Sequence, residues 1–368
     1  MIWVEELINI LKKNSINFYT GVPDSVLKDL SSYLNKLNKK KHIIATNEGS
    51  AVSIGIGHYL STKKIACVYL QNSGLGNAIN PLISLGHKKV YSIPLVLIIG
   101  WRGSSYNKKD EPQHEAQGQI TRELLKLLNI RFCILREKKD LLKFNRLIKT
   151  AYKTKTSIAC LIEKNILKNK KKYKNIKKKN NSISKNNFIS ELLKQISNNS
   201  KIISTTGFTS RELMQVRKDQ KLFKGKDFYM VGGMGHAAMV SLGYSLNSNK
   251  QVICLDGDGS VLMHLGSLRT FGNLGNYNLK HILLNNNSHE SVGGQPTSAA
   301  GINFKELVKS IGYKNYFKIT KFKEINYLIK KFLNSKGPSF LEVLTSQGSL
   351  NNLLRPTNLI KIKKKFME

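Results

Sequence analysis

The sequence has little of what several classes of protein require, and cysteine is the first example. Only four cysteines occur in 368 residues, and none belongs to a Cys-x-x-Cys pair. Each of them, Cys67, Cys133, Cys160 and Cys254, lies within a short apolar run typical of a buried strand. We therefore predict reduced, buried thiols and a reducing compartment rather than a disulfide-rich scaffold.

Signals for membrane insertion and export are also lacking. The longest apolar run, from Ile93 to Trp101, is too short to span a bilayer. The first residues carry Glu5 and Glu6 within a helical pattern, which is not typical of a signal peptide. We therefore expect a cytoplasmic protein that does not bind a membrane.

Acidic residues are scarce relative to basic ones. The chain has 23 Asp and Glu against 60 Lys and Arg, which gives a formal net charge of +37. A polyanion-binding surface is one interpretation, although such surfaces usually show clustered arginine with interleaved aromatic residues. Here lysine is scattered along the whole chain, so we favour solvated lysine-rich faces and expect no nucleic-acid partner. The positive charge can still attract an anionic substrate.

Apolar strand-like runs alternate with helical patterns along most of the chain, which indicates an α/β fold. Several runs are continuous in Val, Ile and Leu, as in parallel strands buried on both faces. In the first half the predicted strands are Asn17–Thr20, His42–Thr46, Ile65–Gln71, Leu95–Trp101, Arg131–Leu135 and Ser157–Ile162. In the second half they are Lys201–Thr205, Asp227–Val231, Gln251–Asp256, Lys280–Asn285, Tyr316–Thr320 and Ser339–Leu344.

A segment rich in Lys and Asn separates the two halves. Residues 164–186 contain few apolar side chains, so we interpret them as a linker or an exposed, loosely ordered crossover. The sequence thus predicts two doubly wound domains with parallel sheets, at residues 1–163 and 187–368.

A Gly-Asp-Gly-Ser run, Gly257 to Ser260, follows one strand of the second half, and the next strand ends in three asparagines. One strand–helix–strand unit therefore places Asp258 and Asn286 at the carboxyl ends of neighbouring strands. Carboxylate and amide oxygens suit Mg²⁺, and Gly257 and Gly259 would allow a phosphate group to approach the backbone. A plain turn with a capping Asp is the alternative.

This pattern resembles the metal–diphosphate motif of thiamine-diphosphate enzymes. The resemblance implies the thiamine-diphosphate-binding fold, with thiamine diphosphate and Mg²⁺ as cofactors. It also implies that Asp258, Asn286 and the backbone carbonyl of Ser288 bind the metal. Three asparagines run together, and we choose Asn286 because it places the following His-Glu-Ser in register with the family. The implied cofactor-binding residues of the motif are Gly257, Asp258, Gly259, Ser260 and Asn286.

A glycine-rich turn, Gly232-Gly233-Met234-Gly235, precedes this motif. By the same resemblance, Met234 supports the bent cofactor and the carbonyl of Gly232 accepts from its 4'-amino group, with Gly233 beside them. Taken alone, the run would be only a tight turn.

Glu48 stands where a strand passes into a helix of small residues, in the run Ala-Thr-Asn-Glu-Gly-Ser. It resembles the glutamate that activates the aminopyrimidine ring in this family. A first-turn Glu that complements the helix dipole is the alternative. In the family, the glutamate domain of one subunit faces the diphosphate domain of another, which implies a homo-oligomer with active sites between subunits.

Longer segments, at residues 20–28, 69–82, 92–103, 109–121, 204–213 and 288–297, resemble the phosphonopyruvate decarboxylase family in particular. The implied substrate is a small anionic 2-oxo acid. Sulfopyruvate decarboxylases are the nearest alternative, and a lysine-rich polyanion-binding protein is an alternative of a different class.

Four further residues are candidates for handling that substrate. Arg102 is a candidate for binding the phosphonate, because a guanidinium fork suits that group. Asp24, His114 and His289 are candidates for orienting the substrate or protonating the product, and their alternatives are an ordinary turn Asp and two loop histidines.

Overall fold

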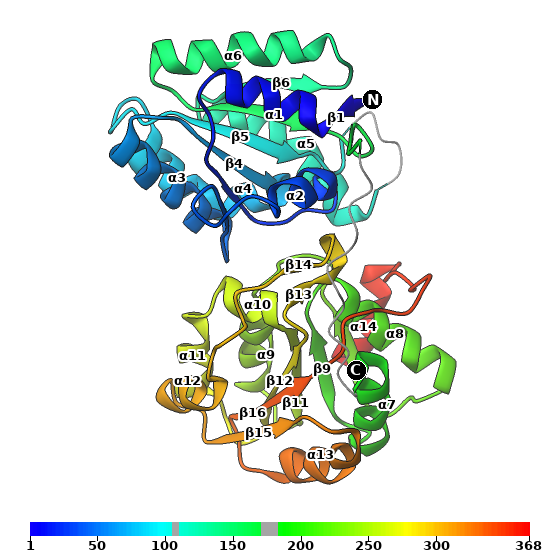
Figure 1. Ribbon diagram of the computed structural model, residues 1–368. Helices are drawn as coiled ribbons and strands as arrows, with labels where there is room; N and C mark the ends of the chain where they lie inside the picture. Colours follow the sequence, from blue (N-terminus) through cyan, green and yellow to red (C-terminus); the bar gives the residue numbers. More distant parts are fainter. Residues whose placement is uncertain (105–109, 171–182) are drawn as a thin grey trace. The chain divides into compact units, whose positions relative to one another are not determined.

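Two parallel sheets organise the chain (Figure 1). The computed structural model describes residues 1–104, 110–170 and 183–368. Its contacts separate two units that divide between residues 175 and 176, with Val292–Gln295 assigned to the first. Each unit contains a six-stranded sheet whose strands all pair in parallel. The predicted fold class, two α/β domains with parallel sheets, is confirmed.

The first sheet has the strand order β3-β2-β4-β5-β7-β6. Its strands are β2 Tyr19–Gly21, β3 His42–Ile44, β4 Ala66–Gln71, β5 Leu95–Gly100, β6 Arg131–Leu135 and β7 Ile158–Ile162. Each overlaps a strand predicted from an apolar run, and each bound lies within two residues of the predicted one. The continuous apolar runs therefore correspond to strands that are covered on both faces.

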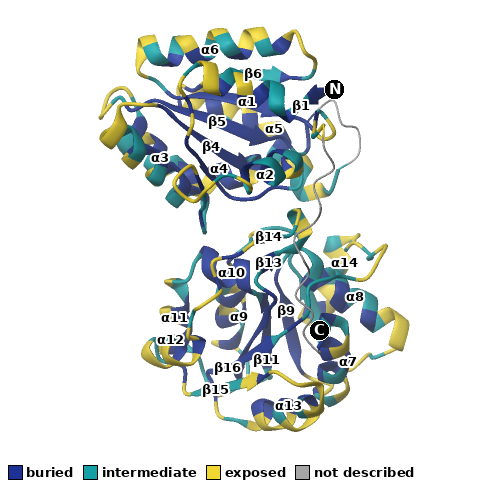
Figure 2. Cartoon of the chain, in the orientation of Figure 1, coloured by how far each residue is buried: buried dark blue, intermediate teal, exposed yellow. Residues whose placement is uncertain are grey.

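Alternate side chains of each strand in this unit point into two separate cores. On β5, for example, Val96 and Ile98 belong to one core, while Leu95, Leu97 and Ile99 belong to the other. The first core is covered by helices α1 Val4–Lys13, α2 Lys28–Leu34 and α6 Asp140–Thr154. The second is covered by α3 Glu48–Thr62, α4 Leu75–Pro81 and α5 Pro112–Leu127. Figure 2 shows the buried strands and the exposed outer faces of these helices.

The second sheet has the order β10-β9-β11-β12-β16-β15. Its strands are β9 Lys201–Ser204, β10 Lys226–Tyr229, β11 Val252–Gly257, β12 Leu279–Asn285, β15 Asn315–Ile319 and β16 Ser339–Leu344. One face packs on α7 Lys185–Gln195, α8 Phe208–Gln220 and α13 Ile325–Asn334. The other packs on α9 Ala237–Ser245, α10 Asp258–Met263, α11 Ser267–Leu274, α12 Phe304–Ser310 and α14 Leu359–Met367.

The described ends of the lysine-rich segment are more ordered than the sequence indicated. Strand β8, Leu167–Lys168, pairs with β1, Ile2–Trp3, and helix α7 begins at Lys185. Leu167 is 4% exposed and Ile183 is fully buried, so apolar side chains anchor both ends. Residues 171–182 of the predicted linker lie outside the described residues.

The cysteines lie on strands as predicted, and none forms a disulfide. Cys67, Cys160 and Cys254 are buried, whereas Cys133 is only half-buried because it lies on the edge strand β6.

In the part of the chain that the structure describes, helices long and apolar enough to cross a membrane are absent.

Two glycines provide a test of the packing. A Cβ atom added at Gly21, on β2, would lie 2.1 Å from the carbonyl oxygen of Tyr69, whereas one added at Gly57, on α3, would meet no atom within 4 Å. We expect Gly21→Ala to lower the free energy of unfolding by about 1–3 kcal/mol through overpacking. Gly57→Ala should raise it by roughly 0.5–1 kcal/mol, because Ala favours the helix. Urea unfolding followed by circular dichroism measures both, and equal midpoints for the two variants would contradict this packing.

Candidate active site

The carboxyl edge of the second sheet brings the predicted metal ligands together. Strands β11 and β12 are parallel neighbours, with Gly257 opposite Leu284. Asp258 follows the end of β11 and Asn286 follows the end of β12, so their side chains emerge at the same edge. Both line one pocket, together with Gly257, Gly259, Ser260, Ser288 and His289.

Asp258 is a buried carboxylate, only 3% exposed. Its Oδ1 accepts a hydrogen bond from the Gly259 N–H (3.0 Å), and its Oδ2 accepts one from the Thr297 hydroxyl (2.7 Å). Burial raises its pKa to about 6, although these hydrogen bonds oppose the rise. Within the described ranges, no Lys or Arg forms an ion pair with this carboxylate. A buried carboxylate that lacks a cationic partner fits a bound divalent cation.

The three consecutive asparagines differ in their surroundings. Asn286 is buried and lines the pocket with Asp258. Its Oδ1 accepts from the Ser288 N–H (3.0 Å), which fixes the turn that carries the Ser288 carbonyl. Asn285 instead donates its amide to Glu342 (2.9 Å), and Asn287 adopts a positive φ of 55°. These placements support the choice of Asn286 over its neighbours.

The glycine-rich turn Gly232–Gly235 lies beside the start of α10. The Gly235 N–H donates to the Ser260 hydroxyl (3.0 Å), and Met234 lines the same pocket as Asp258. Gly233 and Gly235 have positive φ angles of 62° and 88°, so the turn requires glycine. A Cβ atom at Gly259 would lie 2.7 Å from the His289 ring and 3.2 Å from the Met234 methyl. The Gly259 backbone, the Met234 thioether and the His289 imidazole therefore lie in close contact.

His289 is a neutral base in this pocket, because burial lowers its pKa to about 4. It lies on the short strand β13, Ser288–His289, which pairs with β14, Gln295–Pro296. A neutral imidazole can both donate and accept a hydrogen bond at neutral pH.

Several lining residues were not among the predicted site residues. Thr205 and Thr206 come from the loop after β9 and Phe208 is the first residue of α8, and the Thr205 hydroxyl lies 2.8 Å from that of Ser260. A signal for them existed, since the Ser-Thr-Thr-Gly run follows a strand adjacent to β11 at the same sheet edge. Lys185, Glu290 and Ser291 also line the pocket.

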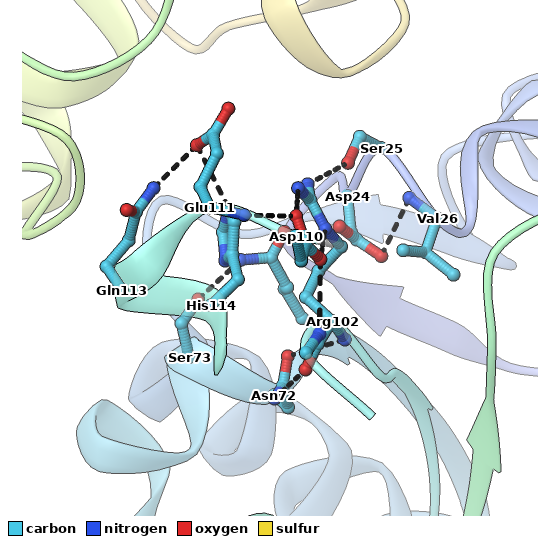
Figure 3. Close-up of polar contacts among 12 residues, drawn as sticks. Asp24, Ser25, Val26, Asn72, Ser73, Arg102, Asp110, Glu111, Gln113 and His114 are labelled. Atoms are coloured by element: carbon cyan, nitrogen blue, oxygen red, sulfur yellow. Dashed lines mark hydrogen bonds and ion pairs between the residues drawn. The ribbon is translucent and has the colours of Figure 1, made fainter. Parts of the chain in front are cut away.

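The first unit gathers a second polar group at the carboxyl edge of its own sheet (Figure 3). Asp24 follows β2, Asn72 follows β4 and Arg102 follows β5, and these three strands are neighbours. Asn72 bridges the loops, because its Oδ1 accepts from the Arg102 N–H (3.1 Å) and its amide donates to the Arg102 carbonyl (3.0 Å). His114, in the first turn of α5, lies with its Nε2 3.6 Å from Glu111 Oε2.

The Arg102 guanidinium group is held in a fork by Asp110. Its Nε donates to Asp110 Oδ2 (2.7 Å) and its NH2 group pairs with Oδ1, while NH1 reaches the Ser25 hydroxyl (3.3 Å). Asp110 Oδ2 also accepts a hydrogen bond from the Gly103 N–H (3.1 Å). The fork predicted to bind a substrate anion therefore already has a carboxylate partner, and Asp110 is a residue that the sequence analysis missed.

Asp24 is 1% exposed and is held by its own loop. Its Oδ2 accepts from the N–H groups of Val26 (3.1 Å) and Leu27 (3.2 Å), and its Oδ1 has no hydrogen-bond partner among the described residues. Burial raises its pKa to about 6, which outweighs the opposing effects of these N–H groups and of Arg102. A Cβ atom at Gly100 would lie 1.9 Å from Asp24 Oδ2, so this approach requires glycine.

Glu48 is the first residue of α3 and is 6% exposed. The preceding Asn47 caps the helix by accepting from the Ser50 N–H (2.8 Å). Burial raises the pKa of Glu48, while a hydrogen bond from the Asn77 amide to its Oε2 (2.8 Å) opposes the rise. Gly74 lies against the carboxyl group, since a Cβ atom there would be 2.2 Å from Oε1. Glu48 is thus a buried carboxyl group with a raised pKa, held by Asn77 and pressed closely by the Gly74 backbone.

Comparisons with known proteins match both units. The N-terminal TPP binding domain of thiamine pyrophosphate enzymes matches residues 2–123, and the C-terminal TPP binding domain matches residues 204–343. A phosphonopyruvate decarboxylase of Streptomyces viridochromogenes is 31% identical over 97% of this chain and 91% of its own length. One from Streptomyces hygroscopicus is 30% identical over 97% and 90%. A sulfopyruvate decarboxylase of Methanosarcina acetivorans is 26% identical over 99% and 96%.

The raised pKa of Asp24 has a consequence for stability. Because the folded-state pKa of about 6 exceeds the ordinary 3.8, the contribution of Asp24 to stability is fully present below about pH 3.8. It is lost as the pH rises through 6. Asn does not titrate, so Asp24→Asn should gain stability over the wild type between pH 4 and pH 8, by on the order of 3 kcal/mol.

Urea unfolding across this pH range tests the prediction, with the exposed Asp219→Asn as the control. A difference between Asp24→Asn and the wild type that does not change with pH would contradict it.

Proposed function

This chain belongs to the family of thiamine-diphosphate-dependent decarboxylases that includes the phosphonopyruvate decarboxylases, and we propose that it converts phosphonopyruvate to phosphonoacetaldehyde and CO₂. It is a carboxy-lyase. The observation that supports this substrate is similarity to phosphonopyruvate decarboxylases along 97% of the chain. We place the reaction in phosphonate biosynthesis, in the cytoplasm.

In this proposal the pocket of the second unit holds Mg²⁺ and the diphosphate group. Asp258, Asn286 and the Ser288 carbonyl would be the metal ligands, and the fit rests on the buried Asp258 carboxylate, which has no cationic partner among the described residues. When bound, thiamine diphosphate supplies the electron sink for the electrons released with CO₂. Met234 would support the cofactor, and the surrounding glycines would let its diphosphate approach the backbone.

Glu48 is the proposed proton-exchanging group for the aminopyrimidine ring. Its burial at a helix start and its raised pKa are what such a role requires. In the family this glutamate serves a cofactor bound by a neighbouring subunit, so we propose a homo-oligomer with shared active sites.

The polar group of the first unit would handle the substrate. Asp24, with a pKa of about 6, can hold a proton near neutral pH and is a candidate donor to the product. His114 and the neutral His289 are candidates for orienting the 2-oxo acid. Arg102 is a candidate for the phosphonate. Among the described residues its NH1 group reaches only the Ser25 hydroxyl, so this edge of the guanidinium group is the one that Asp110 leaves for an anion.

Decarboxylation of sulfopyruvate is the second candidate function. It is favoured by the 26% identity to a sulfopyruvate decarboxylase, which extends over 99% of this chain. Phosphonate and sulfonate groups each carry three oxygens and differ by one ionisable proton, so the same basic surroundings could accept either group.

An assay of the purified protein separates these candidates. Phosphonopyruvate, sulfopyruvate and pyruvate are compared by CO₂ release, each with and without thiamine diphosphate and Mg²⁺. We expect turnover only with both cofactors present, and the highest kcat/KM for phosphonopyruvate. A higher kcat/KM for sulfopyruvate would replace the proposed substrate.

The proposed role of Glu48 predicts that a substitution there lowers turnover without preventing cofactor binding. Glu48→Gln keeps the shape of the side chain and its contact with Asn77 but removes the titratable proton, so kcat should fall at least about a hundredfold. Isothermal titration calorimetry should show that thiamine diphosphate and Mg²⁺ still bind. The exposed Glu123→Gln on α5 is the matched control. Wild-type turnover by Glu48→Gln would count decisively against this mechanism.

A further inference from the structure

Three charged side chains from distant segments meet beside the pocket of the second unit. Lys185 is the first residue of α7, Glu212 lies on α8 and Glu290 follows β13. Their side chains are 6%, 1% and 11% exposed. The Lys185 ammonium group pairs with Glu290 Oε2 and lies 3.6 Å from Glu212 Oε1. We refer to these three residues as the lysine clamp.

The charges of the lysine clamp are removed from water, so the loss of one partner would be strongly destabilising. Two carboxylates share one ammonium group, and removing Lys185 would leave both without a cation from the described part of the chain. Burial raises the pKa of Glu212 to about 7, with the Glu290 charge adding to the rise and Lys185 opposing it.

The lysine clamp also contacts the turn that carries the proposed metal ligands. Glu290 is two residues beyond Ser288 and directly follows His289. Its second oxygen, Oε1, accepts from the Gly348 N–H in the loop after β16. That loop reaches back to the ligand turn, because the Gln347 amide donates to the Asn286 carbonyl (3.1 Å).

The start of α7 is held by the same loop. The Ser346 N–H donates to the Ile183 carbonyl (2.7 Å), two residues before Lys185. The ligand turn, the loop after β16 and the start of α7 are therefore tied together, and Glu290 joins all three. A shift of Lys185 would be passed to Glu290 and, through it, to the Ser288 carbonyl.

We propose that Lys185 is a positioning residue of the metal–diphosphate site, which acts by holding Glu290 and thereby fixing the backbone of Asn286–Ser288. This inference rests on the proposed function, because it assumes that this turn binds the metal. It extends that function by adding a residue from α7, which lines the same pocket and acts through Glu290 rather than as a metal ligand. Residues that orient metal ligands from outside the coordination sphere typically change metal affinity when they are substituted.

The test measures Mg²⁺ affinity rather than turnover. Isothermal titration calorimetry of the full chain gives the Kd for Mg²⁺ at saturating thiamine diphosphate. Lys185→Met keeps the length of the side chain without its charge and should weaken Mg²⁺ binding roughly 10–100-fold. Lys185→Arg keeps the charge and should recover part of that loss. Lys194→Met, a half-exposed position on the same helix, is the control and should bind like the wild type.

Two further variants separate positioning from general stability. Glu290→Gln breaks the connection to the ligand turn and should weaken Mg²⁺ binding as Lys185→Met does. Glu212→Gln leaves the Lys185–Glu290 pair in place and should have less than a threefold effect. Thermal unfolding of the cofactor-free proteins by circular dichroism accompanies each titration. If Lys185→Met does not fold, then Lys185→Arg, Glu290→Gln and Glu212→Gln decide the question.

The outcomes are distinct. Wild-type Mg²⁺ affinity in a folded Lys185→Met or Glu290→Gln protein would overturn the positioning role, even if stability fell. Equal losses in Glu212→Gln and Glu290→Gln would also overturn it. If the wild-type chain bound no cofactor in the presence of Mg²⁺, the metal site and this inference would both fail. If it bound the cofactor but did not turn over phosphonopyruvate, only the proposed substrate would fail.

Discussion

Both units depend on one constraint, the burial of carboxyl groups that have no ion-pair partner among the described residues. Glu48, Asp24 and Asp258 each lie at or below 6% exposure and, within the described residues, none is paired with Lys or Arg. Burial raises the pKa of all three. Few such groups persist in a folded protein unless a ligand or a proton compensates their charge. The parallel sheets place these groups near the carboxyl ends of strands, where a ligand can approach and compensate their charge.

The two units use the same local design for different chemistry. In each, a residue that follows one parallel strand is hydrogen-bonded to a residue that follows a neighbouring strand, as Asn72 is to Arg102 and Thr205 is to Ser260. In the proposed function, the first unit presents groups that hold or move protons, whereas the second presents groups suited to a cation and phosphate oxygens. This division agrees with the match of the two units to separate TPP binding domains.

Much of the fold could be predicted from the sequence because buried parallel strands are long apolar runs, and strand–helix–strand spacing then placed Asp258 and Asn286 at one edge. The lysine clamp could not be predicted, since Lys185, Glu212 and Glu290 are far apart in the chain and Lys185 lies in a lysine-rich segment. The Arg102–Asp110 pair was missed for a related reason: ionic partners depend on loop geometry, which no periodicity encodes. The small β1–β8 sheet was missed because two-residue strands leave no repeating pattern.

Three glycines lie directly against side chains of the proposed site: Gly74 against Glu48, Gly100 against Asp24 and Gly259 against His289. Any β-carbon at these positions would displace the group whose placement matters, so a mutagenesis library that includes them would return mostly inactive clones. Efforts to evolve a new substrate preference in the laboratory would do better to leave these positions fixed. The variable positions would then be those around the Arg102–Asp110 pair, where side chains rather than backbone define the space open to an anion.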